Sequence, residues 1–198
     1  IEIDNELYTV TISEQGGVIT SFLLKNFRQE KAEDSPAVNL VQTDQTQGYP
    51  LGFSWGSVVD RNMLYTFDRA DIEFDSTTKK ATLSMRALSS SGLEVIRTYH
   101  FHQTNYLIEH QTTVVNKSGQ VLQGGAVLHQ SNLPFSELTR ASNWLFRGPS
   151  MYGEAGHQQF KLKEFDDGPQ TVQGGFDWVD YEGTYFMTGI IPTDNSQS

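Results

Sequence analysis

The 198-residue sequence contains no cysteine, and this absence removes three kinds of chemistry. A chain without thiols forms no disulfide, holds no metal through thiolate and carries no cysteine nucleophile. The compartment stays open, because a cytoplasmic protein and an exported bacterial protein without disulfides both fit this count.

Basic residues are also scarce, since 14 Lys and Arg stand against 24 Asp and Glu and the formal net charge is −10. Nucleic-acid binding depends on clustered cations that release counterions, so we expect no nucleic-acid partner. The same charge argues against lying on an anionic lipid surface, and no run of about 18 apolar residues is present to cross a membrane. The sequence begins at Ile1 without an initiator Met or a signal peptide. We therefore expect it to be a piece of a longer protein.

Short alternating apolar and polar segments dominate what is present, and Gly, Asn, Asp and Ser separate them. In the first, Tyr8, Val10 and Ile12 share one face. This period of two is typical of half-buried antiparallel strands. It predicts strands at 6–12, 18–24, 38–41, 71–74, 81–88, 93–102, 106–115, 121–129, 176–181 and 184–191. Only 158–165 is predicted as a short helix, and the polar segments 26–37 and 42–50 as surface loops. The pattern favours one β-sandwich-like domain.

The best-defined local element is a hairpin whose turn lies around residues 103–106. Pairing Phe101 with Ile108 places Tyr99 opposite His110 and Val95 opposite Val114. One apolar face then gathers Leu93, Val95, Tyr99, Phe101, Tyr106, Ile108 and Val114. The turn-forming residues 116–119 predict a further antiparallel strand from Val121, which would make a three-stranded meander.

The same register places His100 directly opposite Glu109 on the polar face, with His102 two residues along. A histidine and a carboxylate are the usual acid and base of sugar anomerisation, so the pair is a candidate catalytic couple. His100 and His102 could also supply two metal ligands, with His110, His129 or His157 as a third. The competing interpretation is an exposed cross-strand ion pair without chemistry.

Three tryptophans, Trp55, Trp144 and Trp178, are candidates for a carbohydrate or peptide groove, but such residues more often pack in a core or at its rim. Residues 116–118 have the form of a glycosylation acceptor that the turn already explains. The sequence has neither a phosphate-binding glycine loop before a helix nor a nucleophile elbow. We therefore assign no catalytic, cofactor-binding or metal-ligating residue.

Four segments carry a resemblance to a known family. Near the start, residues 15–27 (QGGVITSFLLKNF) have a Gly-Gly turn that leads into a strand. Near the end follow 146–149 (FRGP), 174–179 (GGFDWV) and 185–192 (YFMTGIIP), in matching order and spacing. This pattern resembles the large periplasmic domain of YidC-type membrane protein insertases.

The resemblance implies an all-β fold, a mainly antiparallel super-β-sandwich related to galactose mutarotase with little helix. It implies that 1–198 is a single periplasmic domain, at the periplasmic face of the bacterial inner membrane, in a parent protein anchored by helices outside this chain. It also leads us to expect that the parent continues past Ser198 with further strands, a helical connector and transmembrane helices.

The implied function is that of a non-catalytic accessory domain without a cofactor. It would assist membrane protein insertion and folding together with the Sec translocon, including SecD and SecF, and with client membrane proteins. The alternative is a mutarotase-like carbohydrate-active enzyme or a carbohydrate-binding protein.

Overall fold

The computed structural model describes residues 1–32, 34–133 and 146–193. The chain divides into two compact units, Ile1–Ser131 (unit 1) and Asn132–Ser198 (unit 2). In the described residues, helix is limited to two 3-10 turns, η1 Asp60–Asn62 and η3 Leu162–Phe165. All strand pairs are antiparallel, which confirms the all-β prediction with little helix.

The first sheet of unit 1 has the order β1-β2-β3-β4. Its strands are β1 Glu2–Asp4, β2 Tyr8–Ile12, β3 Ile19–Arg28 and β4 Ala37–Asn39. The predicted inward face of β2 is confirmed, since Tyr8, Val10 and Ile12 are all buried while Thr9 and Thr11 are half-buried. Alternation placed this strand correctly because one of its faces covers the core.

The second sheet of unit 1 has the order β10-β9-β8-β7. Its strands are β7 Thr66–Phe67, β8 Lys80–Leu88, β9 Leu93–His102 and β10 Ile108–Asn116. The hairpin register is confirmed, with Phe101 paired to Ile108 and His100 to Glu109. Burial is less even than expected. The β9 side of the apolar face is buried, whereas Ile108 and Val114 on β10 are half-buried and Tyr106 is exposed.

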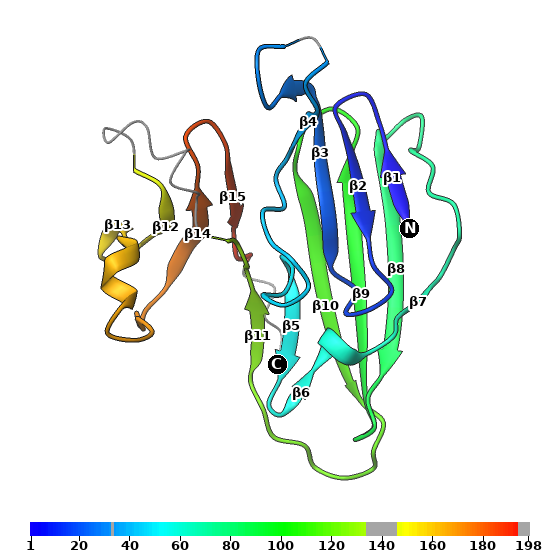
Figure 1. The fold of residues 1–198 in the computed structure, drawn as a ribbon. Helices are drawn as coiled ribbons and strands as arrows, with labels where there is room; N and C mark the ends of the chain where they lie inside the picture. The colour runs from blue at the N-terminus through cyan, green and yellow to red at the C-terminus, as the bar shows by residue number, and fades with distance from the viewer. Residues whose placement is uncertain (33, 134–145, 194–198) are drawn as a thin grey trace. The chain divides into compact units, whose positions relative to one another are not determined.

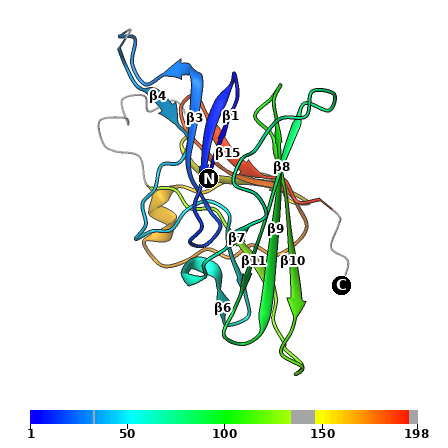
Figure 2. The same cartoon turned by 90° about the vertical axis from the view of Figure 1, so that its right-hand side faces the viewer.

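These two sheets pack face to face in unit 1, as the blue and green strands of Figures 1 and 2 show. The Tyr8 hydroxyl donates to the His102 carbonyl at 2.7 Å, and the Tyr99 hydroxyl donates to the Gly17 carbonyl at 2.9 Å. Each bond joins one sheet to the other and satisfies a buried phenol. Unit 1 therefore contains a β-sandwich, as predicted.

The third sheet of unit 1 corrects one prediction. It consists of β5 Gly52–Trp55, β6 Val58–Val59 and β11 Ala126–His129, in the order β11-β5-β6. The expected meander is wrong, because β11 pairs with β5 and not with β10, and 121–125 form no strand. The turn is local: Asn116 donates to the Gln120 carbonyl at 2.6 Å and accepts from the Ser118 amide at 2.9 Å. Such a turn is complete without deciding which strand its continuation joins.

Unit 2 is built on one sheet of order β13-β12-β14-β15. Its strands are β12 Gly148–Gly153, β13 Gly156–Gln159, β14 Phe176–Glu182 and β15 Met187–Ile190. The helix predicted at 158–165 is wrong in its first half. Gly156, at φ 81°, begins a strand that pairs back on β12, so only Leu162–Phe165 turns as a 3-10 helix. A two-residue hairpin turn therefore overrode a weak helical pattern.

Other differences concern short or unpaired segments. In 71–74, Ile72 and Phe74 are half-buried and their neighbours exposed, but the segment joins no sheet among the described residues. Strand β3 extends to Arg28, into the predicted loop 26–37, while 42–50 is a loop as expected. No strand was predicted at β1, β5, β6, β7, β12 or β13, which have two to six residues and lack a clear alternation of apolar and polar side chains.

Candidate functional site

The candidate acid-base pair does not form, because Glu109 contacts Lys80 and His102 in place of His100. Glu109 Oε1 lies 2.9 Å from His102 Nε2 and 2.9 Å from Lys80 Nζ, whereas His100 Nδ1 lies 2.8 Å from the Thr82 hydroxyl. Long side chains on neighbouring strands reach their diagonal partners, so direct opposition did not decide the contact. The hydrogen bond from Lys80, and then that from His102, lowers the pKa of Glu109. Glu109 thus takes part in an exposed cross-strand pair, as the competing interpretation expected, but its partners are Lys80 and His102.

The four histidines of unit 1 do not form one cluster. His110 belongs to the inward face of β10, where its ring lies 4.6 Å from that of Tyr99, while His100 and His102 are on the other face of the same sheet. His129 ends β11 in the third sheet, and His157 belongs to β13 in unit 2. Across 1–32, 34–133 and 146–193, no three His, Asp or Glu side chains cluster as a metal site.

The tryptophans occupy separate places. Trp55 is half-buried on β5, and its ring fills the space where a Cβ at Gly124 would stand. Trp178 is half-buried on β14, with its ring 6.1 Å from Tyr152 and 5.5 Å from His157. Trp144 lies outside the described residues. The two described tryptophans therefore lie half-buried on interior strands of two different sheets.

The feature that sequence reasoning missed is a buried ion pair in unit 1. Arg97 occupies a core-facing position of β9 and is 0% exposed, and Asp60, the first residue of η1, is 1% exposed. Arg97 Nη1 donates to Asp60 Oδ2 at 3.2 Å. The signal was present: in 93–102 the alternation that buries Val95 and Tyr99 puts an arginine on the same face. A charge in that position requires a buried partner.

Asp60 is held by three groups from its surroundings. Besides Arg97, the Phe53 amide donates to Oδ1 at 3.0 Å and the Tyr65 hydroxyl donates to Oδ2 at 3.3 Å. Burial raises the pKa of the Asp60 carboxyl, and the Phe53 amide and the Arg97 guanidinium offset part of this rise. A general base has to reach a substrate proton, and both oxygens of this carboxyl are already engaged by the protein.

Arg97 also ties three chain segments together. Nη1 donates to the Gly16 carbonyl at 2.9 Å, Nη2 donates to the Leu51 carbonyl, and Nε donates to His110 Nε2 at 3.3 Å. Burial, followed by the charge of Arg97, lowers the pKa of His110 to about 3. At neutral pH the imidazole is therefore uncharged and accepts at Nε2. One arginine thus fixes the β2–β3 turn and the segment before β5 against β9.

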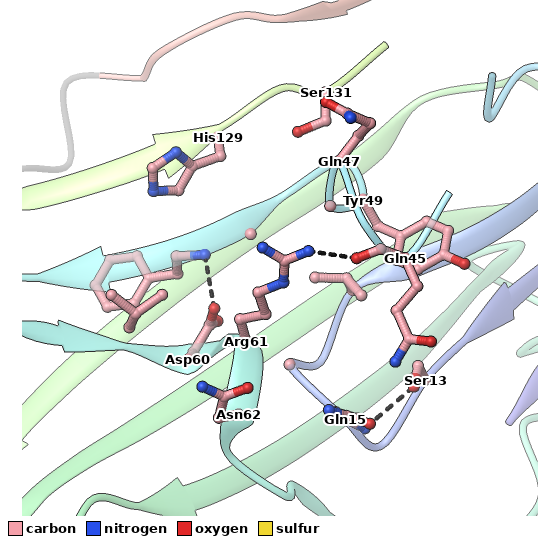
Figure 3. Close-up of a pocket in the computed structure, with 16 residues that line it drawn as sticks. Ser13, Gln15, Gln45, Gln47, Tyr49, Asp60, Arg61, Asn62, His129 and Ser131 are labelled. Atoms are coloured by element: carbon pink, nitrogen blue, oxygen red, sulfur yellow. Dashed lines mark hydrogen bonds between the residues drawn. The ribbon is translucent and has the colours of Figure 1, made fainter. Parts of the chain in front are cut away.

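A cavity of about 410 Å³ lies over this pair (Figure 3). Side chains from four segments of unit 1 line it: 13–18, 45–49, 52–62 and 129–131. Leu51, beside it, has a φ of 66°, a left-handed conformation that costs a branched residue about 1–3 kcal/mol. Its amide donates to the His129 carbonyl at 2.8 Å and its carbonyl accepts from Arg97. The strained backbone is thus held by the ion pair below and by β11.

The arrangement is suited to binding rather than to proton transfer. The cavity presents mostly neutral polar side chains, and its Arg61 guanidinium is held by the Thr46 carbonyl. The Asp60 carboxyl is closed off by Arg97, Phe53 and Tyr65. Among the described residues, no helix is long and apolar enough to span a bilayer.

Comparison with known proteins gives a consistent result. The sequence model described as "YidC periplasmic domain" matches residues 1–198. Curated proteins named "Membrane protein insertase YidC" are similar over nearly all of the chain. That of Syntrophus aciditrophicus is 26% identical over 99% of this chain, and that of Geobacter sulfurreducens is 26% identical over 98%. The protein of Maridesulfovibrio salexigens is 25% identical over 99%.

In each of these three alignments the chain covers 36% of the relative, so it spans about a third of the length of the curated proteins it matches. The resemblance stated for residues 15–27 and for the three later segments is thereby confirmed. Because the family model covers every residue, this chain belongs to the YidC periplasmic domain family.

Proposed function

We propose that this chain is a non-catalytic accessory domain of a bacterial membrane protein insertase, exposed at the periplasmic face of the inner membrane and anchored by helices outside the chain. The observation that carries this proposal is the family match over residues 1–198, together with relatives named as membrane protein insertases. The match covers the residues of both compact units, which supports one domain over 1–198.

The absence of catalysis is supported by how the candidate groups are engaged. Glu109 is ionised and paired with Lys80 and His102 on an exposed strand face. Asp60 is buried against Arg97. Asp60 and His129 both line the cavity, but the Asp60 oxygens are engaged by Phe53, Tyr65 and Arg97, and His129 Nε2 lies 3.2 Å from the Ser54 hydroxyl. Neither side chain is therefore free to serve as an acid or base for anomerisation.

The competing mutarotase-like function has a direct assay. We expect the 198-residue chain to leave the anomerisation rate of galactose, followed by polarimetry, at its value in buffer. His100→Ala and Glu109→Gln should not alter that rate. If the wild-type chain accelerated anomerisation and either substitution abolished the acceleration, the chain would be an enzyme and the proposed non-catalytic role would be wrong.

The partners proposed are SecD and SecF of the Sec translocon, together with client membrane proteins. The test uses the intact parent insertase, purified in mild detergent, and compares it with a parent that lacks residues 1–198. We expect the deletion to lower the amounts of SecD and SecF that copurify while the membrane helices still insert, which protease protection checks. Unchanged copurification would show that the translocon contacts lie elsewhere in the parent.

A further inference from the structure

We propose that the cavity over the Asp60–Arg97 pair binds a neutral polyhydroxylated small molecule, a sugar or a polyol. This proposal does not rest on the proposed accessory role. It requires no catalytic step.

The cavity has the size and rigidity of a ligand site. Its volume of about 410 Å³ falls within the range of small-molecule pockets. Arg97 fixes two of its walls from below, through the carbonyls of Gly16 and Leu51. The left-handed backbone of Leu51 is maintained there by tertiary contacts, as is common where a binding surface is held ready.

The lining matches hydroxyl groups. Four amide side chains and three hydroxyl side chains face the cavity, among them Gln15, Gln47, Asn62 and Tyr49 (Figure 3). An amide or hydroxyl side chain both donates and accepts hydrogen bonds, as does every hydroxyl of a sugar. Phe53 and Tyr49 add aromatic surface that suits the apolar face of a sugar ring.

The charged groups Arg61 and Asp60 in the cavity are already hydrogen-bonded within the protein, which favours a neutral ligand. Arg61 Nη2 donates to the Thr46 carbonyl at 2.8 Å and also to the Gln45 carbonyl, so the guanidinium is held by the loop that forms one wall. Asp60 is paired with Arg97. An anion would also meet a chain of net charge −10.

An extended peptide fits less well. Peptides commonly dock by adding a strand to an open sheet edge. The strand beside the cavity, β5, is paired on one side with β11 and on the other with β6, so it offers no free ladder. Apolar lining is limited to a few side chains such as Val18 and Val59, too few for the alternating pockets that a peptide needs.

The test is an NMR titration of the isotope-labelled 198-residue chain with glucose, trehalose and glycerol at millimolar concentration. Inorganic phosphate and trialanine serve as the anionic and peptide probes. We expect the neutral probes to shift amide signals of 13–18, 45–49 and 129–131. If only glycerol shifts these signals, the ligand class is a polyol. If glucose or trehalose shifts them, the ligand class is a sugar.

Two exposed glutamines provide the variants. Gln15→Ala and Gln47→Ala each remove an amide from the lining, while Gln120→Ala removes one from an exposed loop outside it. We expect each lining variant to weaken binding about 3- to 10-fold, the value of one net hydrogen bond, and the control to leave it unchanged. Thermal melts establish that all three remain folded.

Three outcomes would overturn the proposal. They are no shift with any neutral probe, equal affinities for the lining and control variants, and stronger binding of phosphate or trialanine than of the neutral probes. Should one glutamine variant fail to fold, the other and Asn62→Ala provide the same comparison.

Discussion

Arg97 sits where the alternation of β9 calls for an apolar side chain, and its consequences reach several parts of unit 1. Its guanidinium meets a carboxylate, two carbonyls and an uncharged imidazole, so all its nitrogens act as donors to buried or half-buried acceptors. A buried ion pair adds little stability relative to a packed apolar pair. Its effect here is positional, because it holds the β2–β3 turn and Leu51 in place.

Asp60→Asn tests the ion pair. We expect a loss of about 3–5 kcal/mol in the free energy of unfolding, because the substitution leaves the Arg97 charge buried without a counterion. Urea unfolding followed by circular dichroism measures it. The matched control is Asp4→Asn, which breaks the exposed pair with Lys25 and should cost less than about 1 kcal/mol. Equal losses of unfolding free energy in the two variants would show that the buried pair contributes no more to stability than the exposed pair.

His110 predicts a pH dependence. Its pKa falls from 6.5 to about 3 on folding, so between these values the unfolded chain binds a proton that the folded chain does not. Stability from neutral His110 is therefore fully present above pH 6.5 and decreases as the pH falls toward 3, by at most about 1.4 kcal/mol per pH unit.

The measurement for His110 is urea unfolding across that pH range. His110→Gln keeps an acceptor for Arg97 and should flatten the slope, whereas His100→Gln, on the opposite face of the sheet, should leave it in place. A wild-type slope that survives His110→Gln would assign the dependence to other groups.

At the scale of elements, the β2–β3 turn shows how local and tertiary requirements meet. Gly16 and Gly17 have φ values of 74° and 61°, as the Gly-Gly pair predicts. A Cβ at Gly17 would lie 3.1 Å from Met85 Cε and 3.2 Å from Arg97 Cδ. The requirement for a left-handed backbone can be inferred from the Gly-Gly sequence. The requirement for a residue without a Cβ arises only after the opposite sheet has packed against the turn.

Gly17→Ala and Gly119→Ala separate the cost of the left-handed backbone from the cost of the close packing. Gly119 has a similar φ of 72°, but no atom lies within 4 Å of its Cβ position. We expect about 1–2 kcal/mol for the left-handed backbone at either position, and about 1–3 kcal/mol more at Gly17 for overpacking. Chemical denaturation of both variants measures the difference. Equal losses would show that the close approach is relieved by side-chain movement.

For the whole molecule, the open question is whether the two compact units unfold as one domain over 1–198, as proposed. Leu83→Ala removes a fully buried side chain of unit 1, and Met151→Ala removes an 8% exposed one of unit 2. We expect each to lower the same single thermal transition, by about 2–5 kcal/mol for the fully buried leucine. Amide signals of β9 and β14 followed during melting report the two units separately. Distinct transitions, each moved by only one variant, would divide the chain into two domains.

Alternation along the chain was enough to place the strands that cover a core over several residues, such as β2, β8 and β9, and to set the register of the β9–β10 hairpin. A period of two fixes both the face and the register once one face is buried, and a short turn joins the two strands. The family resemblance was likewise readable, because it rests on short segments of fixed spacing.

Three pairings became visible only in the folded chain. Strand β11 pairs with β5, Glu109 contacts His102 and Lys80, and Arg97 pairs with Asp60, 37 positions away. In each case the local pattern of apolar and polar residues is compatible with more than one partner. The local sequence does not specify which partner is chosen. The choice of partner depends on which sheet faces meet when the sheets pack and on which buried charge would otherwise remain unpaired.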